Sequence, residues 1–369
     1  MFLAAFKLSN KRFIENSMMH MTVGTKTSTS SIQEAASLFL KNYKDCTIVP
    51  TSGGVNNVVQ YVTTPTGDKF ILRIYNNGGN TPRVKFEHDV LKGLSSTKLA
   101  FSIPTFIPSH INGLTHSKIS SGAEACLCHI IPGTLPKTRG AKDIGRAAGE
   151  LCTALSKVDK SKLSPCPTPP YYDLYKVHHA VTRDIFYNEM KTDAFKDCRE
   201  WADLLVKEIN EIEETIKKYQ NQGLPIQLIH GDLHQDNVLC DENDKVTGLL
   251  DFEFTSYDWR AMELAICLSK YAGEGDKAFD LFKEFVIGYS EHGILTRKEV
   301  EAIPDLIILR VLSNVVYFVG RAVSGEDKID SLTTRAKTYY TRVQWLKNNN
   351  NRLVQLIDDI MRPKMGKNY

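Results

Sequence analysis

The sequence predicts an α+β protein with two lobes, a small N-terminal lobe built on an antiparallel sheet and a larger C-terminal lobe made mainly of helices. Two early segments have strand patterns: residues 69–75 alternate between two faces, and residues 125–131 are mainly apolar. Later, apolar residues recur at helical spacing over residues 144–158 and 201–216. A chain of 369 residues is long enough for both lobes.

The composition is that of an ordinary soluble globular protein, with 42% hydrophobic and 24% charged residues. The formal net charge of +3 is nearly balanced, and no block of like charge marks a surface for nucleic acid or a membrane. No apolar run reaches the roughly 18 residues of a transmembrane helix. We therefore expect a cytoplasmic protein that binds neither nucleic acid nor membranes, and its oligomeric state stays open.

The first 30 residues show no clear structural pattern, and we expect an extension that is disordered. Its mixture of apolar and basic residues leaves an organelle-targeting segment open as the alternative. The tetrapeptide Ser31-Ile-Gln-Glu34 has the form of a capping box and is predicted to begin the first helix. The predicted divisions of the chain are residues 1–30, 31–131 and 132–369.

The centre of the predicted site is a pair of segments, residues 228–237 (LIHGDLHQDN) and residues 249–254 (LLDFEF). The residues between them have the pattern of a hairpin with a polar turn. This hairpin would bring Asp232, Asn237 and Asp251 to one end of a small sheet. Phosphoryl transfer needs these groups: a carboxylate near the attacking hydroxyl, and an amide with a second carboxylate to hold Mg²⁺ against nucleotide phosphates.

The spacing His230-x-Asp232-x-x-x-x-Asn237, followed by Asp251-x-Glu253, resembles the catalytic and metal loops of the aminoglycoside phosphotransferase and choline kinase superfamily. These proteins are small-molecule kinases related to protein kinases. The resemblance extends from about residue 31 to about residue 350. It implies a two-lobed protein-kinase-like fold, with ATP and Mg²⁺ as cofactors.

The residues after this motif resemble most closely the branch that contains type II homoserine kinases, through Asp258 and Glu263-Leu-Ala265. The resemblance implies that Glu263 braces the catalytic loop, with substrate recognition as its second possible role. Asp258 is assigned to the substrate. His234, within the motif, is interpreted as a surface imidazole.

The resemblance also assigns roles within the motif. Asp232 is the catalytic base, or the group that orients the substrate hydroxyl and accepts its proton late. His230 belongs to the same catalytic loop and orients it by hydrogen bonding. Asn237 and Asp251 are assigned as Mg²⁺ ligands, and Glu253 is a second ligand or a substrate contact.

The nucleotide-binding lobe is expected to begin with a hairpin that covers the nucleotide. Its glycines, Gly53 and Gly54, let backbone N–H groups approach phosphate, and Asn57 follows them. A strand cation must also meet the phosphates, and the resemblance selects Arg73, although Lys69 lies on the same face. Further assigned residues are Glu87, which would pair with the strand cation, and the hinge residues Cys128, His129, Ile130 and Ile131, whose backbone would bind adenine.

The helix predicted over residues 306–321 is apolar except for one polar stripe, formed by Arg310, Asn314, Tyr317 and Arg321. Because unpaired buried charge is costly, this stripe must meet partners or solvent. A wall of the substrate pocket is one interpretation, in which an arginine binds a substrate carboxylate. Salt bridges to the rest of the lobe are the other. A proline-rich loop at residues 164–173, with the nearby His178 and His179, either lines the pocket or covers the lobe.

The predicted reaction moves the γ-phosphate of ATP onto a hydroxyl of a small molecule. Homoserine or a similar amino alcohol is the specific expectation, and choline, methylthioribose and aminoglycoside-like sugars stay open. A protein kinase is disfavoured because no arginine follows His230 and because Glu253 stands where glycine is usual. A pseudokinase that serves as an ATP-binding scaffold is disfavoured by the intact Asp232, Asn237 and Asp251.

Overall fold

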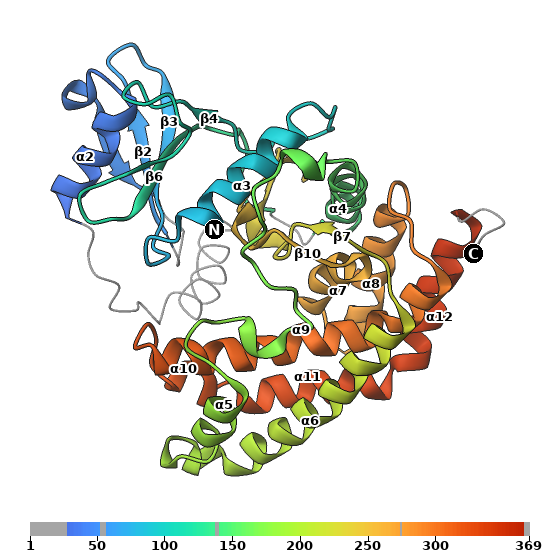
Figure 1. Cartoon of the computed structure of the whole chain (residues 1–369). Helices are drawn as coiled ribbons and strands as arrows, with labels where there is room; N and C mark the ends of the chain where they lie inside the picture. The colour runs from blue at the N-terminus through green and yellow to red at the C-terminus, as the bar shows by residue number, and fades with distance from the viewer. Residues whose placement is uncertain (1–27, 52–56, 137–139, 274, 365–369) are drawn as a thin grey trace, which may run out of the picture.

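A computed structural model describes residues 28–51, 57–136, 140–273 and 275–364 of the chain. It shows an antiparallel sheet with α2 (Thr29–Phe39) against it, and a larger body of helices that begins with α4 (Ala141–Leu155) (Figure 1). The predicted α+β architecture is confirmed. The expectations for the N-terminal extension concern residues 1–27, which lie outside the described residues.

The sheet has the order β1-β2-β3-β6-β4, with β5 also paired to β6, and its pairs are antiparallel. On β3, Leu72 and Ile74 enter a buried core shared with α2, whereas Arg73 lies on the opposite face. The strands are β1 (Thr47–Pro50), β2 (Val58–Thr63), β3 (Lys69–Ile74), β4 (Phe106–Ile107), β5 (Ser117–Lys118) and β6 (Glu124–His129).

The predicted start of the first helix is wrong. Ser28 caps α2 by accepting the backbone N–H of Ser31, so the helix begins before the expected capping box. Glu34 does not reach back to the helix start. Its carboxylate accepts hydrogen bonds from the backbone N–H and the hydroxyl of Ser120, at 2.6 and 2.7 Å, which ties α2 to the sheet region.

The helical part is organised around α9 (Arg297–Val323), which packs against α6, α7, α11 and α12. This helix is long and apolar enough to span a membrane by length and composition, but 72% of its most apolar window is buried inside the protein, as in a core helix. The other helices are α3 (Thr81–Leu94), α5 (Arg183–Glu189), α6 (Arg199–Gln222), α7 (Arg260–Ser269), α8 (Asp276–Tyr289), α10 (Asp330–Thr333), α11 (Ala336–Asn348) and α12 (Asn350–Met361). Short 3-10 helices occupy Tyr43–Asp45, Lys160–Lys162, Leu174–Lys176, Asp193–Cys198, Gln235–Asn237, Phe252–Phe254 and Arg362–Lys364.

Two small antiparallel pairs carry the predicted site. β7 (Ile226–Ile229) pairs with β10 (Ser256–Trp259), and β8 (Val238–Cys240) pairs with β9 (Val246–Leu249). The hairpin predicted between the two motif segments is therefore confirmed. β7 leads into the first motif segment, and β9 leads into the second. The backbone N–H of Leu250 donates a hydrogen bond to the carbonyl oxygen of Asn237, which joins the two loops.

Candidate active site

His230 is fully buried and fixes the loop that follows β7. Its Nε2 lies 2.9 Å from the carbonyl oxygen of Leu250, and its Nδ1 accepts the backbone N–H of Asp232 at 3.2 Å. These partners place the ring proton on Nε2. Burial lowers the pKa of His230 to about 4, so the ring is neutral. His230 therefore positions Asp232 and does not itself face solvent.

The turn after His230 accepts only glycine. Gly231 has φ +83°, and a Cβ there would lie 2.3 Å from the carbonyl oxygen of Phe254. On α7, Glu263 accepts a hydrogen bond from the backbone N–H of His230 at 2.5 Å. The bracing role predicted for Glu263 is thus visible as a direct contact with the loop backbone.

Replacing Glu263 by Gln should change how stability depends on pH. Burial raises the pKa of Glu263 to about 7, whereas an unfolded glutamate titrates near about 4.3. As pH rises through this window the unfolded state ionises first, so the wild-type protein loses stability. Gln keeps the oxygen that accepts the His230 N–H but has no proton to lose. The wild-type free energy of unfolding minus that of the variant, from urea titrations, should therefore fall as pH rises; a constant difference would contradict the raised pKa.

Asp232 lies between the guanidinium of Arg310 and the imidazole of His234. Its Oδ1 accepts a hydrogen bond from Arg310 of α9 at 2.8 Å, and its Oδ2 lies 3.4 Å from Nε2 of His234. Burial alone would raise the pKa of Asp232, but the hydrogen bond from His234 and the charges of Arg310 and Lys270 hold it well below its usual value. Asp232 is therefore an ionised acceptor that is held in one orientation.

The interpretation of His234 as a surface imidazole is wrong. Its side chain is only 11% exposed and contacts Asp232 on one side and Asp236, at 3.3 Å, on the other. Burial works to lower the pKa of His234, but its hydrogen bonds to the two carboxylates raise it above the usual value. His234 therefore belongs to the electrostatic surroundings of Asp232.

Asn237 connects the two motif loops. Its Nδ2 donates to the carbonyl oxygen of Asp232 at 2.9 Å, and its backbone carbonyl accepts the N–H of Leu250 at 2.9 Å. The side-chain oxygen at the other end of the amide is then the atom that Asn237 offers to a cation.

Arg73 joins the sheet to the second motif loop. Its Nη1 lies 3.1 Å from Glu87 on α3, and its Nη2 lies 2.9 Å from Asp251 and 3.2 Å from Glu253. Lys69 is exposed at the other end of β3, opposite Thr63. The structure thus places Arg73, and not its rival, at the loop that contains Asp251.

Three carboxylates crowd around this guanidinium, and the arrangement fits a divalent cation. Burial raises the pKa of Glu87 to about 7 and also raises the pKa of Asp251, in both cases against the opposing charge of Arg73. Asp251 has a left-handed backbone, with φ +64°, which is uncommon outside glycine and is often found at functional sites. A cation would relieve the crowding, and the oxygens of Asn237 and Asp251 are of the kind that Mg²⁺ prefers.

Other residues assigned to the nucleotide are placed as follows. Gly53 and Gly54 lie outside the described residues. Asn57 uses both ends of its amide within the protein, since Nδ2 donates to Glu253 and Oδ1 accepts the backbone N–H of Asn76, each at 3.1 Å. In this structure Asn57 orients Glu253.

β6 ends with the hinge residues Cys128 and His129, and Ile130 and Ile131 follow it. Cys128 is largely buried, and its thiol donates to the carbonyl oxygen of Ile71 at 3.6 Å. His129, Ile130 and Ile131 line a pocket of about 490 Å³ together with residues 94–105, the connection from α3 to β4. This pocket lies between the hinge and that connection, and its lining includes neither Asp232 nor Asp251.

The assignment of Asp258 to the substrate is wrong. Asp258 is fully buried, and its two oxygens accept the backbone N–H groups of Tyr171 and Trp259, each at 2.6 Å. Burial raises its pKa to about 7. The hydroxyl of Tyr171 donates to the carbonyl oxygen of Gly231 at 2.8 Å. Asp258 therefore holds the proline-rich loop against the catalytic loop.

The polar stripe of α9 divides into two halves. Arg310 donates to Asn314 and to Asp232, so this half faces the first motif loop. Arg321 donates to Asp327, to Glu326 at 3.0 Å and to the Tyr317 hydroxyl at 3.3 Å. The second half thus follows the alternative interpretation, in which the stripe forms salt bridges within the lobe.

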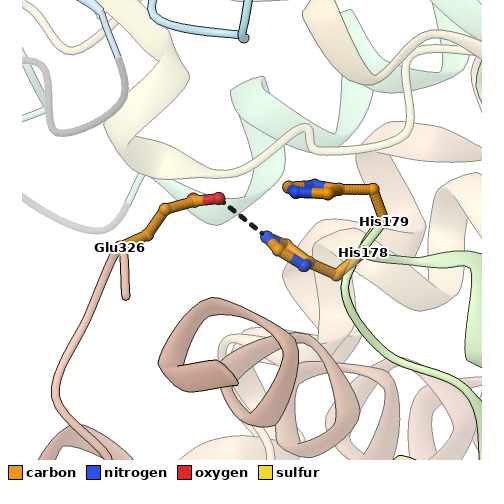
Figure 2. Close-up of side chains that lie close together, drawn as sticks. All are labelled: His178, His179 and Glu326. Carbon is orange, nitrogen blue, oxygen red and sulfur yellow. Dashed lines mark hydrogen bonds and ion pairs between the residues drawn. The ribbon is translucent and has the colours of Figure 1, made fainter. Parts of the chain in front are cut away.

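His178, His179 and Glu326 gather at the end of α9, as Figure 2 shows, and their potential ligand atoms lie within 4.8 Å of one another. His178 Nδ1 accepts the backbone N–H of Ala180, so its proton is on Nε2, which lies 3.2 Å from Glu326. A metal would need the Nε2 lone pair, and Arg321 already holds the other Glu326 oxygen. The cluster is therefore better described as a hydrogen-bonded ion-pair network than as a metal site.

Solved structures with similar folds include small-molecule kinases. A microcompartment-associated aminopropanol kinase superposes with a TM-score of 0.64 at 14% identity, over 89% of this chain and 99% of its own. An amicoumacin kinase, solved in complex with AMP-PNP, Ca²⁺ and Ami, gives a TM-score of 0.61 at 15% identity, over 88% of this chain and 94% of its own. At this identity the likeness establishes the fold, and the predicted two-lobed, protein-kinase-like architecture is confirmed.

Curated relatives by sequence include homoserine kinases. The enzyme of Zymomonas mobilis is 26% identical over 304 residues, which cover 76% of this chain and 84% of the relative. A shorter match to the enzyme of Sinorhizobium medicae is 37% identical over 93 residues, 25% of this chain and 28% of that relative.

A family model described as the phosphotransferase enzyme family matches residues 47–292, which include Arg73, both motif loops and Glu263. This match favours a small-molecule kinase over a protein kinase and over a binding scaffold. Nucleotide and divalent-metal use is typical of these kinases, as the amicoumacin kinase complex illustrates. The chain belongs to the APH phosphotransferase enzyme family and is a small-molecule kinase.

Proposed function

We propose that this kinase transfers the γ-phosphate of ATP to the side-chain hydroxyl of homoserine or a similar hydroxylated amino acid, with Mg²⁺ as its metal. The observation that carries the proposal is the contact between Asp232 and Arg310 at 2.8 Å, which puts a guanidinium beside the carboxylate assigned to the acceptor hydroxyl. The names of the sequence relatives add support. The expected cytoplasmic location stays a prediction.

Asp232 accepts a hydrogen bond from the acceptor hydroxyl and takes its proton late, as the new O–P bond forms and the bond to the leaving ADP breaks. Because neighbouring cations keep its pKa low, Asp232 acts mainly by orienting the hydroxyl. Arg73 supplies positive charge to the phosphates. Asn237 and Asp251 hold the metal, with Glu253 beside them, and bound Mg²⁺ would neutralise charge on the phosphate oxygens.

The charges around Asp232 favour an acceptor that carries a carboxylate. Arg310 is 9% exposed and its guanidinium lies 2.8 Å from Asp232, so its positive charge acts where the acceptor hydroxyl would bind. The hydrogen bond from His234 and the charge of Lys270 also lower the pKa of Asp232, so both favour negative charge at the same place. An acceptor with only positive charge, such as choline or an aminoglycoside, would be repelled by this group, whereas an amino acid carboxylate would be attracted.

Three acceptors that differ in one group each test the proposal: L-homoserine, 3-aminopropan-1-ol, which lacks the carboxylate, and 4-hydroxybutanoate, which lacks the amine. ADP formation with Mg²⁺ and ATP should give the highest kcat/KM for homoserine, and 4-hydroxybutanoate should be used better than 3-aminopropan-1-ol. A preference for 3-aminopropan-1-ol over both other acceptors would refute the proposed substrate class.

Replacing Arg310 by Gln should weaken the binding of homoserine more than the binding of 3-aminopropan-1-ol, which has no carboxylate. A hydrogen bond to a charged group contributes about 1.5–3 kcal/mol, so KM for homoserine should rise roughly 10- to 100-fold. KM for ATP should stay unchanged, and steady-state kinetics with both acceptors measures the difference. Arg321→Gln is the matched control, since Arg321 pairs with Glu326 and Asp327 and should affect thermal stability only. Equal losses for homoserine and 3-aminopropan-1-ol would show that Arg310 acts only through Asp232.

A further inference from the structure

Tyr75 forms the surface on which the Arg73 guanidinium rests. The two residues are two positions apart, so their side chains extend to the same side of the chain as it leaves β3. The guanidinium carbon of Arg73 lies 4.5 Å from the centre of the Tyr75 ring, and Tyr75 is 1% exposed. The nitrogens of the same guanidinium face the three carboxylates already described.

The ring of Tyr75 is itself held in place. Its hydroxyl lies 3.1 Å from Nε2 of His88 and accepts a weak hydrogen bond from the Cys126 thiol. His88 is stacked on Phe106, with ring centres 3.6 Å apart and planes at 8°, and its Nδ1 lies 2.7 Å from the Thr115 hydroxyl. His88 directly follows Glu87 on α3. One anchor therefore fixes both the ring under Arg73 and the helix that carries its ion-pair partner.

We propose that Tyr75 is a positioning residue that holds the Arg73 guanidinium in the orientation that meets the nucleotide phosphates. The inference rests on the phosphate role that the proposed function gives to Arg73. A planar guanidinium can stack flat on an aromatic ring and still direct its fork of N–H groups outward, whereas a lysine ammonium meets a ring only as a point charge. The pairing accounts for an arginine, and not a lysine, at position 73 of this chain.

Two variants of Tyr75 separate the ring from its hydroxyl. A cation–π contact in a buried place contributes about 1–2 kcal/mol, so Tyr75→Leu should raise KM for ATP roughly 5- to 30-fold. Tyr75→Phe keeps the ring and should stay within about threefold of the wild type. KM for the acceptor should not change in either variant. An unchanged KM for ATP in Tyr75→Leu would overturn the inference.

A matched control separates positioning from stability. Leu72 is fully buried on the other face of β3, in the core shared with α2, so Leu72→Ala should lower the melting temperature without touching Arg73. If Leu72→Ala raises KM for ATP as much as Tyr75→Leu does, Tyr75 has only a structural role and the inference fails.

Arg73→Ala distinguishes this inference from the proposed function. If Arg73→Ala leaves KM for ATP unchanged, the phosphate role of Arg73 fails, and the inference falls with it. If Arg73→Ala raises KM for ATP, adding Tyr75→Leu to that variant should raise it no further, because Tyr75 acts through the missing guanidinium. A further increase equal to that of Tyr75→Leu alone would show that Tyr75 acts elsewhere and would refute the inference on its own.

Discussion

Replacing Asp232 by Asn is expected to lower kcat by roughly 10²–10⁴-fold while leaving the affinity for ATP within about twofold. An amide keeps the size of the side chain but accepts no proton, and its NH₂ group cannot pair with Arg310 as the carboxylate does at 2.8 Å. Single-turnover rates with Mg²⁺ and ATP, together with nucleotide titrations, separate the chemical step from binding.

Asp236→Asn is the matched control for this variant. Asp236 is a carboxylate of the same loop and also contacts His234, at 3.3 Å, but its side chain is 66% exposed. The Asp236→Asn variant should lose little turnover, because Asp236 does not contact Asp232. Turnover above about a tenth of the wild type in Asp232→Asn would remove the proton-accepting role assigned to Asp232.

Replacing Asp251 by Asn should abolish the dependence of nucleotide binding on Mg²⁺. Asn is preferable to Ala here because the backbone at this position has φ +64°, which Asn tolerates. The change removes a hard anionic ligand and the ion pair with Arg73 at 2.9 Å. With nucleotide at about 100 times its dissociation constant, the wild-type protein should gain roughly 2.7 kcal/mol, and thermal shifts should show that gain lost in the variant.

Asp244→Asn makes the same chemical change in a comparable backbone. Asp244 lies in the turn between β8 and β9 and has φ +57°. Its replacement should leave the Mg²⁺-dependent thermal shift intact. A normal shift in Asp251→Asn would exclude Asp251 as a metal ligand.

The parts of the fold that the sequence predicted are those set by local patterns. The alternating β3, the hairpin between the motif loops and the apolar helices follow from spacing within a few residues. The start of α2 could not be predicted in this way, because several adjacent polar residues can each cap a helix. Ser28 is the cap, and Glu34 of the expected capping box contacts Ser120 instead. A capping box is a local signal that a distant contact can override.

Site residues that depend on long-range contacts were harder to predict. The burial of His234 could not be predicted, because the pattern of its own segment does not show that its side chain is only 11% exposed between Asp232 and Asp236. Asp258 was misassigned because its partner Tyr171 lies 87 positions away. The stripe of α9 was found by its periodicity, but periodicity could not show that Arg310 faces Asp232 while Arg321 pairs with Glu326.

The difference between local patterns and long-range contacts also affects what the sequence can say about the substrate. The family match ends at residue 292, before α9, so Arg310 lies outside the part of the chain that the family model describes. The motif loops define the phosphoryl transfer, and the residue proposed to recognise the acceptor comes from a helix that the motif does not cover. On this proposal, substrate identity depends on the contacts of α9 and cannot be inferred from the motif alone.

The central claim is that this chain moves the terminal phosphate of ATP onto an acceptor hydroxyl. Phosphorus NMR of the protein with Mg²⁺, ATP and L-homoserine tests it directly. We predict a new phosphomonoester signal that grows in equal amount with ADP and that requires both Mg²⁺ and the acceptor. ADP that appears only together with inorganic phosphate, at a rate independent of the acceptor, would contradict the account.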